Sequence, residues 1–275
     1  MKPAAFEYER PRSCAEAARL LQQSAGRGKV ISGGQSLGAM MNLRLAQPEL
    51  LVDVRAIDAL HGCEIEADAV WFGANTTHAA IEDGRVTDPT GGLMRQVAGG
   101  IAYRAVRNRG TLGGSLAHAD PAADWVNLMA LLGAQYRLQG TGAARTVLSA
   151  DWMAGAFTTA LREEEILTAV RIPRLSPQAR WSYYKVSRKA GEFALALAGI
   201  VDDPARGLRR ALIGAIDGAP HVFDAGALID HWHKSAADIE LEAAGLRPGT
   251  YEYQIHATAL ARAVASASAM RRPLA

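Results

Sequence analysis

The sequence is poor in cysteine. Only two of its 275 residues are cysteines, Cys14 and Cys63, and they are isolated from each other and from any histidine at metal-ligand spacing. A [2Fe-2S] cluster normally needs four thiolates. Neither a disulfide framework nor an iron–sulfur cluster can therefore be built from this chain alone.

Excess charge and long apolar runs are also missing. Thirty basic residues against 28 acidic residues give a net charge of +2, whereas nucleic-acid binding usually requires a concentrated basic surface. No stretch approaches the length of a membrane span, and residues 1–10 contain no uninterrupted apolar segment. We therefore expect a soluble, cytoplasmic chain that does not bind nucleic acid. With 49% hydrophobic residues, it can bury a substantial core in more than one lobe.

Common nucleotide-binding signatures are absent as well. The sequence has no Gly-x-x-x-x-Gly-Lys-Ser/Thr motif, and no Gly-x-Gly-x-x-Gly motif follows an expected strand. Neither a P-loop nor a Rossmann-type site is therefore supported. No Ser–His–Asp or Cys–His arrangement is recognisable either.

The hydrophobic pattern predicts a mixture of strands and helices. Ser13 and Glu16 have capping-box spacing, which predicts a helix over residues 15–23. Asp120 suits a helix N-cap and Pro121 the first helical position, so a helix is expected to begin there. Further helices are expected near residue 77 and over residues 225–233, 235–241 and 251–267. Strands are expected over residues 29–31, 50–54, 69–73, 135–138, 146–148, 165–172, 181–186, 193–201 and 208–216.

Two segments combine paired glycines with hydroxyl residues: Ser32-Gly33-Gly34-Gln35-Ser36-Leu37 and Gly110-Thr111-Leu112-Gly113-Gly114-Ser115. Glycine permits positive φ and close approach of the backbone, so successive N–H groups can converge on an anion, to which hydroxyls add donors. A pyrophosphate is the natural ligand. Either segment alone is better explained as a turn. Two segments of similar composition favour a pyrophosphate site.

These residues resemble a known family, the medium, FAD-binding subunits of molybdenum hydroxylases related to carbon monoxide dehydrogenase and xanthine dehydrogenase. Members carry an Ala-Gly-Gly-x-Ser-Leu segment and a Thr-Ile-Gly-Gly segment, which correspond here to residues 32–37 and 111–114. Ser32 stands where alanine is usual, and Leu112 stands where isoleucine is usual. The resemblance is long, extending from Phe6-Glu7-Tyr8 to Lys185-Val186-Ser187-Arg188.

The resemblance implies which residues bind FAD. Both glycine segments would hold the diphosphate, Asp124 would lie near the ribityl or ribose hydroxyls, and Lys185 near the polar edge of the isoalloxazine. Leu167, with neighbouring Ile166, would pack on or beside that ring. Each has another explanation: helix N-terminal charge for Asp124, strand core for Ile166 and Leu167, and a solvated face for Lys185. The expected FAD-binding residues are Ser32, Gly33, Gly34, Gln35, Ser36, Leu37, Thr111, Leu112, Gly113, Gly114, Ser115, Asp124, Ile166, Leu167, Lys185 and Phe193.

Phe193 lies in a segment where the family often has a tyrosine close to the flavin. A phenylalanine can stack on the ring and exclude solvent, but it cannot donate a hydrogen bond. Core packing is an equally good explanation for this side chain. His118 adjoins the second glycine segment, where it could touch the nucleotide or make a structural hydrogen bond.

The implied fold is α+β: a vanillyl-alcohol-oxidase (PCMH)-type FAD-binding part in two lobes, residues 1–57 and 58–177, followed by a C-terminal domain, residues 178–275. That domain would resemble the C-terminal domain of carbon monoxide dehydrogenase flavoproteins, with a three-stranded antiparallel sheet and helices. Pro173 and the Ser176-Pro177 pair indicate the boundary before it.

The implied function is that of an oxidoreductase subunit. A large partner subunit would oxidise the substrate at a molybdopterin cofactor, and a small partner subunit would carry electrons through [2Fe-2S] clusters. FAD in this chain would pass them to a terminal acceptor. The expected assembly is a dimer of heterotrimers, a heterohexamer. The alternatives are a self-contained flavin reductase of the same fold and an assembly scaffold that has lost FAD.

Overall fold

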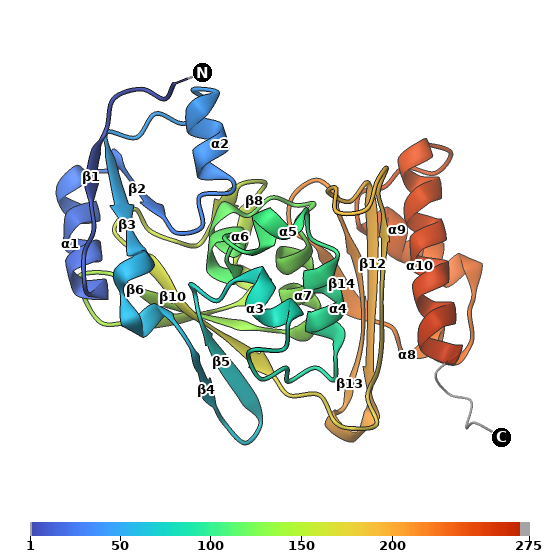
Figure 1. Cartoon of the computed structure of the whole chain (residues 1–275). Helices are drawn as coiled ribbons and strands as arrows, with labels where there is room; N and C mark the ends of the chain where they lie inside the picture. The colour runs from blue at the N-terminus through green and yellow to red at the C-terminus, as the bar shows by residue number, and fades with distance from the viewer. Residues whose placement is uncertain (1, 270–275) are drawn as a thin grey trace.

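A computed structural model describes residues 2–269 of the chain. In this part, three main sheets lie along the molecule, and helices pack between and outside them (Figure 1). The N-terminal sheet, in blue, and the last helix, in red, lie at opposite ends. The expected α+β fold is confirmed.

Residues 2–57 contain a parallel sheet with the strand order β1-β3-β2. Its strands are β1 (Glu7–Glu9), β2 (Gly28–Ile31) and β3 (Leu50–Asp53). Helix α1 (Cys14–Ser24) packs on it, and the shorter α2 (Leu37–Asn42) follows β2. Helix α1 begins at the predicted cap because the Ser13 hydroxyl accepts a hydrogen bond from the N–H of Glu16 at 3.1 Å.

Residues 58–177 contain an antiparallel sheet with the strand order β4-β5-β10-β6-β7. Its strands are β4 (Cys63–Ile65), β5 (Ala69–Gly73), β6 (Gln135–Gln139), β7 (Arg145–Leu148) and β10 (Ile166–Pro173). Strand β10, the last of these five strands in the sequence, thus occupies the centre of the sheet. A separate hairpin consists of β8 (Met153–Gly155) and β9 (Thr158–Thr159).

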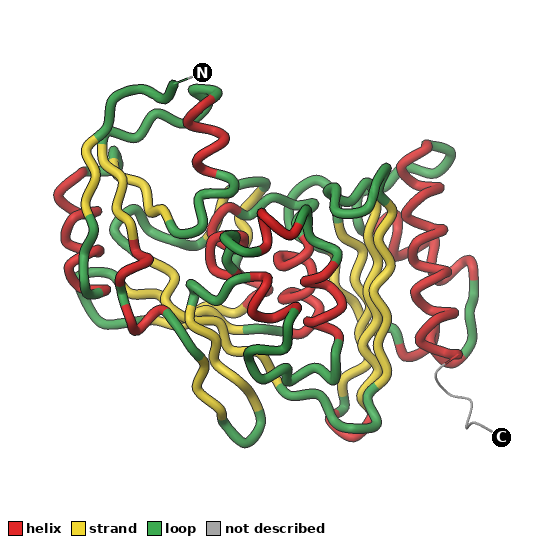
Figure 2. Tube along the Cα trace, viewed as in Figure 1, coloured by secondary structure: helices red, strands yellow, loops and turns green. Residues whose placement is uncertain are grey.

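Five helices lie between residues 74 and 134 and gather at the centre of the molecule (Figure 2). They are α3 (His78–Glu82), α4 (Leu93–Gly99), α5 (Arg104–Arg107), α6 (Leu112–His118) and α7 (Asp124–Leu132). The prediction that a helix begins at Asp120 and Pro121 is wrong, because α7 begins at Asp124. The Asp120 carboxylate instead accepts a hydrogen bond from the N–H of Ala122 at 2.9 Å, which forms a turn before the helix.

Residues 178–269 contain a four-stranded antiparallel sheet in sequence order. Its strands are β11 (Arg180–Val186), β12 (Ala196–Asp203), β13 (Leu208–Gly214) and β14 (His221–Asp224). The prediction of three strands is wrong, because the segment around Pro220 turns the chain into β14, which pairs with β13. Helices α8 (Gly226–Asp230), α9 (Lys234–Ala243) and α10 (Tyr251–Ala269) cover the outer face (Figure 1).

The C-terminal sheet is buried on both faces. One face packs on α10, and the other contacts α4 and α7. All residues of β12 are buried: Ala198 and Ile200 join the cluster under α10, whereas Leu197 and Val201 join the cluster around α7. Side chains at successive positions of a strand point to opposite faces. The junction between the middle part and the C-terminal sheet is therefore hydrophobic core.

Each main sheet lies within one of the three ranges predicted as domains, and the domain division itself stays a prediction. Short 3-10 helices occur at Val54–Ala56, Asp58–Leu60, Ser149–Asp151 and Pro204–Arg206. From residue 2 to residue 269, none of the helices is long and apolar enough to span a bilayer.

Candidate functional site

The first glycine segment connects β2 to α2 and presents a row of backbone N–H groups. Gly34 has a φ of +70°, a conformation that favours glycine. Within residues 2–269, the N–H groups of residues 33–37 have no protein acceptor within hydrogen-bonding distance. Consecutive N–H groups around a residue with positive φ form a concave donor site for anions. This segment thus has the donors that a diphosphate needs.

The two glycine segments touch through their backbones. A Cβ atom at Gly33 would lie 2.1 Å from the carbonyl oxygen of Arg109 and 2.9 Å from the Cα of Gly110. A side chain at position 33 would therefore push the segments apart. The structure thus brings together the two segments that the sequence analysis assigned to one site.

The second glycine segment is the first turn of helix α6 and not a loop. Thr111 is its N-cap, and the Thr111 hydroxyl accepts a hydrogen bond from the N–H of Gly114 at 3.1 Å. The N–H groups of Leu112 and Gly113 donate to carbonyl oxygens of the segment after β5, at 2.8 and 2.9 Å. The N–H groups of residues 112–114 therefore already have protein acceptors, whereas the N–H groups of residues 33–37 in the first segment do not.

The glycines of the two segments are needed for two different reasons, positive φ and close packing. Positive φ, which we expected for both, occurs at Gly34 but not at Gly33, Gly113 or Gly114. A Cβ atom at Gly113 would lie 2.5 Å from the Cβ of Ala74, so glycine is required there by packing within the protein. Close approach to a neighbouring backbone, and not to a ligand, thus explains Gly33 and Gly113.

A buried polar network that the sequence analysis missed holds the first segment. Ser32 Oγ donates to Asn75 Oδ1 at 2.6 Å, and Asn75 Nδ2 donates to the carbonyl oxygen of Val54 at 3.0 Å. Thr111 Oγ1 lies 3.4 Å from Ser32 Oγ. The available signal was the polar run Asn75-Thr76-Thr77, which begins two residues after the apolar strand ending at Gly73. Buried amides at such a position need specific hydrogen-bond partners.

Asp124 and Lys185 form a buried ion pair between α7 and β11. Lys185 Nζ lies 2.7 Å from a carboxylate oxygen of Asp124, and the Tyr183 hydroxyl donates to the same carboxylate at 3.3 Å. Burial raises the pKa of Asp124, and the positive charge of Lys185 opposes this shift. The alternative of a solvated Lys185 is wrong, because only 13% of its side chain is exposed. Tyr183 is a further residue that the motifs did not indicate.

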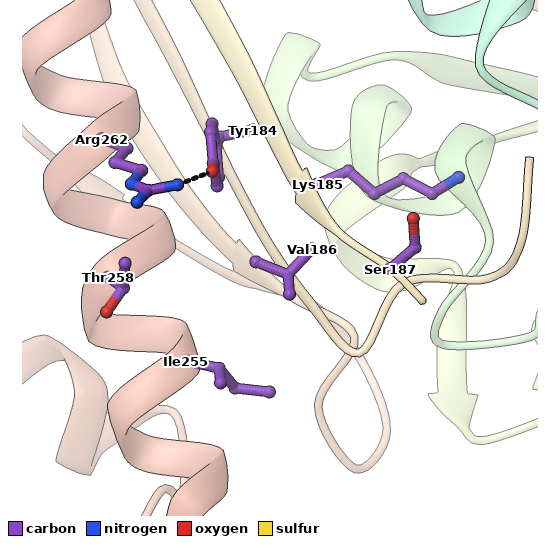
Figure 3. A pocket seen from close by; sticks show the side chains of 7 residues that line it. All are labelled: Tyr184, Lys185, Val186, Ser187, Ile255, Thr258 and Arg262. Atoms are coloured by element: carbon purple, nitrogen blue, oxygen red, sulfur yellow. Dashed lines mark hydrogen bonds between the residues drawn. The ribbon is translucent and has the colours of Figure 1, made fainter. Parts of the chain in front are cut away.

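Two cavities lie on opposite sides of β11. The one beside the ion pair has a volume of about 290 Å³ and is lined by Gln96, Val97, Gly100, Asp124, Tyr183, Tyr184 and Lys185. The other has a volume of about 310 Å³ and lies between β11 and α10. Figure 3 shows Tyr184 and Val186 pointing toward α10, whereas Lys185 extends away from it. The cavity beside the ion pair contains two predicted FAD-binding residues and is the candidate for the flavin ring.

Ile166 and Leu167 point in different directions. Both are buried in β10, but Ile166 packs in the core of the N-terminal part, whereas Leu167 packs in the large central cluster. Neighbouring strand residues face opposite sides of a sheet, and each of these two side chains packs in the core on its own side. Flavin contacts of Ile166 and Leu167 stay predictions.

Phe193 is available to a ligand, because 60% of the residue is exposed. Core packing, the alternative explanation, is therefore wrong. The turn before it contains Gly191, which has a φ of +86° and whose carbonyl oxygen accepts a hydrogen bond from the N–H of Ala102 at 2.9 Å. This bond ties the Phe193 segment to the residues just after Gly100, whose carbonyl oxygen lies 3.4 Å from Lys185 Nζ. Contact between Phe193 and a flavin stays a prediction.

The part of the chain that the structure describes contains no group of three or more His, Cys, Asp or Glu residues that could hold a metal ion. His118 packs on Phe157, with ring centroids 5.2 Å apart. A contact between His118 and a nucleotide stays a prediction.

A comparison with protein families matches most of the chain. Residues 4–175 match the family described as "FAD binding domain in molybdopterin dehydrogenase". The matched range contains both glycine segments and Asp124. It ends between β10 and β11, before the C-terminal sheet begins.

Individual relatives extend the likeness to the rest of the chain. The carbon monoxide dehydrogenase medium chain of Hydrogenophaga pseudoflava is 37% identical over 201 residues, which cover 73% of this chain and 70% of the relative. The nicotine 6-hydroxylase medium subunit of Paenarthrobacter nicotinovorans is 34% identical over 264 residues, covering 94% and 92%. A chain in the structure of reconstituted CO dehydrogenase from Oligotropha carboxidovorans is similar with a TM-score of 0.87 and 33% identity, covering 98% and 99%.

Proposed function

Because this chain belongs to the family of FAD-binding medium subunits of molybdenum hydroxylases, we propose that it passes electrons from the [2Fe-2S] clusters of a partner subunit, through FAD, to a terminal acceptor. The chain is accordingly an oxidoreductase subunit. The observation that carries the proposal is the row of N–H groups at residues 33–37, which lies against the second glycine segment.

The first glycine segment fits the diphosphate of FAD. Its N–H groups need an acceptor, and an anion supplies several acceptor oxygens at once. No backbone atom crowds Gly34, since the nearest atom to a Cβ there would be a side-chain carbon of Ile31 at 3.5 Å. The exposed Gly114 and the neighbouring Ser115 hydroxyl would add contacts from the second segment. Residues of both segments therefore support a diphosphate site.

The residues around the cavity beside Asp124 would hold the remainder of the cofactor. Bound FAD supplies a redox centre that exchanges one or two electrons. Asp124 would accept hydrogen bonds from hydroxyl groups, and Lys185 would place a positive charge near the ring. Phe193 would exclude water from it, and Leu167 would pack beside it.

The proposal gives the chain two partners. By similarity to medium chains of dehydrogenase complexes, we assign the clusters to a small subunit and the molybdopterin cofactor to a large subunit. We further propose a cytoplasmic dimer of heterotrimers. The alternative of a scaffold without FAD is weakened by the free N–H groups, which such a protein would have no reason to keep.

Expression alone and with partners tests this proposal. The isolated chain should show a flavin spectrum, contain no iron or molybdenum, and fail to hydroxylate an organic substrate. Co-expression with the small and large subunits should give a complex in which substrate reduces the flavin. A matched complex with Gly34→Val should assemble but contain no flavin. Substrate oxidation by the isolated, metal-free chain, or its failure to associate with either partner, would overturn the proposal.

A further inference from the structure

We infer that Asn75 is a positioning residue for FAD binding, because it connects the first glycine segment to the middle part of the chain through Ser32. Asn75 lies in the connector of residues 74–77, between β5 and α3. The inference rests on the proposed function, since it concerns the affinity for FAD.

The Asn75 side chain bridges the ends of two parallel strands. Its Oδ1 accepts from Ser32, which directly follows β2, and its Nδ2 donates to the carbonyl oxygen of Val54, which directly follows β3. Both distances, 2.6 and 3.0 Å, are those of well-formed hydrogen bonds. Asn75 therefore fixes where the chain leaves β2 and enters the row of N–H groups.

Because the Asn75 side chain is buried, the loss of either hydrogen bond leaves a polar group without a partner. Asn75 is 4% exposed, so an amide group that lost its partners could not bond to bulk water instead. The bond also turns the Ser32 hydroxyl toward the protein. We expected Ser32 to bind the cofactor, whereas its observed partner is Asn75. The serine that replaces the usual alanine thus adds a connection between the lobes.

The same connector also holds the second glycine segment. The carbonyl oxygen of Ala74 accepts from the N–H of Gly113 at 2.9 Å, and that of Thr76 accepts from the N–H of Leu112 at 2.8 Å. Asn75 lies between Ala74 and Thr76 in the chain, and its side chain holds the first glycine segment through Ser32. Residues 74–76 thereby set the position of both segments relative to each other, and the Asn75–Ser32 bond is the side-chain part of that link.

FAD titration of the full-length apoprotein tests the inference. Asn75→Ala should weaken FAD binding about tenfold, and Ser32→Ala about threefold to tenfold, the range expected for losing one or two net hydrogen bonds. The matched control is Thr76→Val. Thr76 is also buried, and its hydroxyl donates to the carbonyl oxygen of Gly73 at 2.7 Å. Valine removes this bond but keeps the backbone carbonyl of residue 76, which accepts from Leu112, and it leaves the Asn75–Ser32 bond in place. Thr76→Val should change FAD affinity less than twofold.

A double-mutant cycle separates positioning from general destabilisation. If Asn75 acts through Ser32, the double variant Asn75→Ala/Ser32→Ala should bind FAD no more weakly than Asn75→Ala alone. Fully additive losses, or equal losses in Asn75→Ala and Thr76→Val at matched thermal stability, would overturn the inference. If Asn75→Ala does not fold, the FAD affinity of Ser32→Ala tests the inference instead. An affinity of Ser32→Ala equal to that of the wild-type protein would overturn the inference. Wild-type protein without FAD affinity would instead contradict the proposed function.

Discussion

The Lys185 ammonium and the Asp124 carboxylate lie 2.7 Å apart and join the edge strand of the C-terminal sheet to the first turn of α7. The family resemblance assigns these residues to different parts of FAD, the ring edge and the sugar hydroxyls. In this chain they are ion-pair partners. A change at either position therefore alters the charge balance at the other.

Replacing Asp124 by alanine should weaken FAD binding by about 1–3 kcal/mol if the carboxylate holds buried hydroxyl groups. It should also destabilise the fold, because a buried ammonium without its partner costs about 3–5 kcal/mol. Titration of the apoprotein measures the first effect, and chemical unfolding measures the second. The double variant Asp124→Ala/Lys185→Met should regain part of the stability. Unchanged FAD affinity in a folded Asp124→Ala protein would leave this carboxylate with a structural role alone.

Valine at Gly34 and at Gly113 should abolish FAD retention in different ways. At Gly34 a Cβ atom would meet only the Ile31 side chain, at the ordinary contact distance of 3.5 Å, and the positive φ costs about 1–2 kcal/mol. The fold should survive without flavin. At Gly113 the side chain would clash with Ala74, so a marked fall in melting temperature should accompany the flavin loss. The flavin-to-protein absorbance ratio and the melting curve distinguish the two. A normal ratio in both soluble variants would refute the assignment of these segments.

His78 should make the folded protein sensitive to mild acid. Its ring is buried, and Nδ1 accepts a hydrogen bond from the Trp125 indole N–H at 2.9 Å. Burial, with a smaller contribution from the Arg107 charge, lowers the pKa of His78 to about 4. The unfolded chain has a histidine pKa of about 6.5. The stabilisation from the neutral ring is therefore complete above about pH 6.5 and is lost as the pH falls toward 4.

This loss should reach at most about 3 kcal/mol between pH 7 and pH 4. Urea unfolding across this range measures it, with His78→Gln as the control that cannot titrate. Asp53 does not interfere. Burial acts to raise its pKa, but hydrogen bonds from Arg55 and Tyr8 prevail and lower that pKa to about 2, so its contribution falls only below about pH 4. Equal pH dependence of wild type and His78→Gln would contradict the assignment.

Phe193→Ala should change the free energy of unfolding by less than about 0.5 kcal/mol, because the side chain is mostly exposed. If Phe193 shields the flavin, the variant should retain FAD but let dissolved iodide quench the flavin fluorescence more strongly, because the ring no longer excludes solvent. Phe193→Leu, which keeps a large apolar side chain, should be quenched to about the same extent as wild type. Iodide quenching equal to that of wild type in Phe193→Ala would mean that the ring does not cover the flavin.

Local sequence signals predicted much of the fold. The capping box placed α1 correctly, because its bonds form within four residues. The same kind of reasoning misplaced α7, because Asp120 has two local options, an N-cap and a turn, and the packing of the next residues decides between them. The strand β14 was missed because it is short and follows a proline.

The candidate site was predictable where backbone chemistry determines it, and less so where distant residues meet. Paired glycines indicated the two segments, but the sequence could not reveal that Gly33 needs space for Arg109 whereas Gly34 needs positive φ. The Asn75–Ser32 bond spans 43 residues, and no motif marks it. Such contacts depend on how the sheets pack, which single-sequence patterns do not encode.

Strand β10 lies between β5 and β6 in its sheet, although the ribosome produces those two strands first. Until residues 166–173 emerge, β5 and β6 of the nascent chain lack their shared hydrogen-bonding neighbour, and the N-terminal core lacks Ile166. Unpaired strand edges invite aggregation. The nascent chain thus carries two open strand edges until β10 is made, and the cavity beside Asp124 cannot form before β11, which the ribosome makes later still.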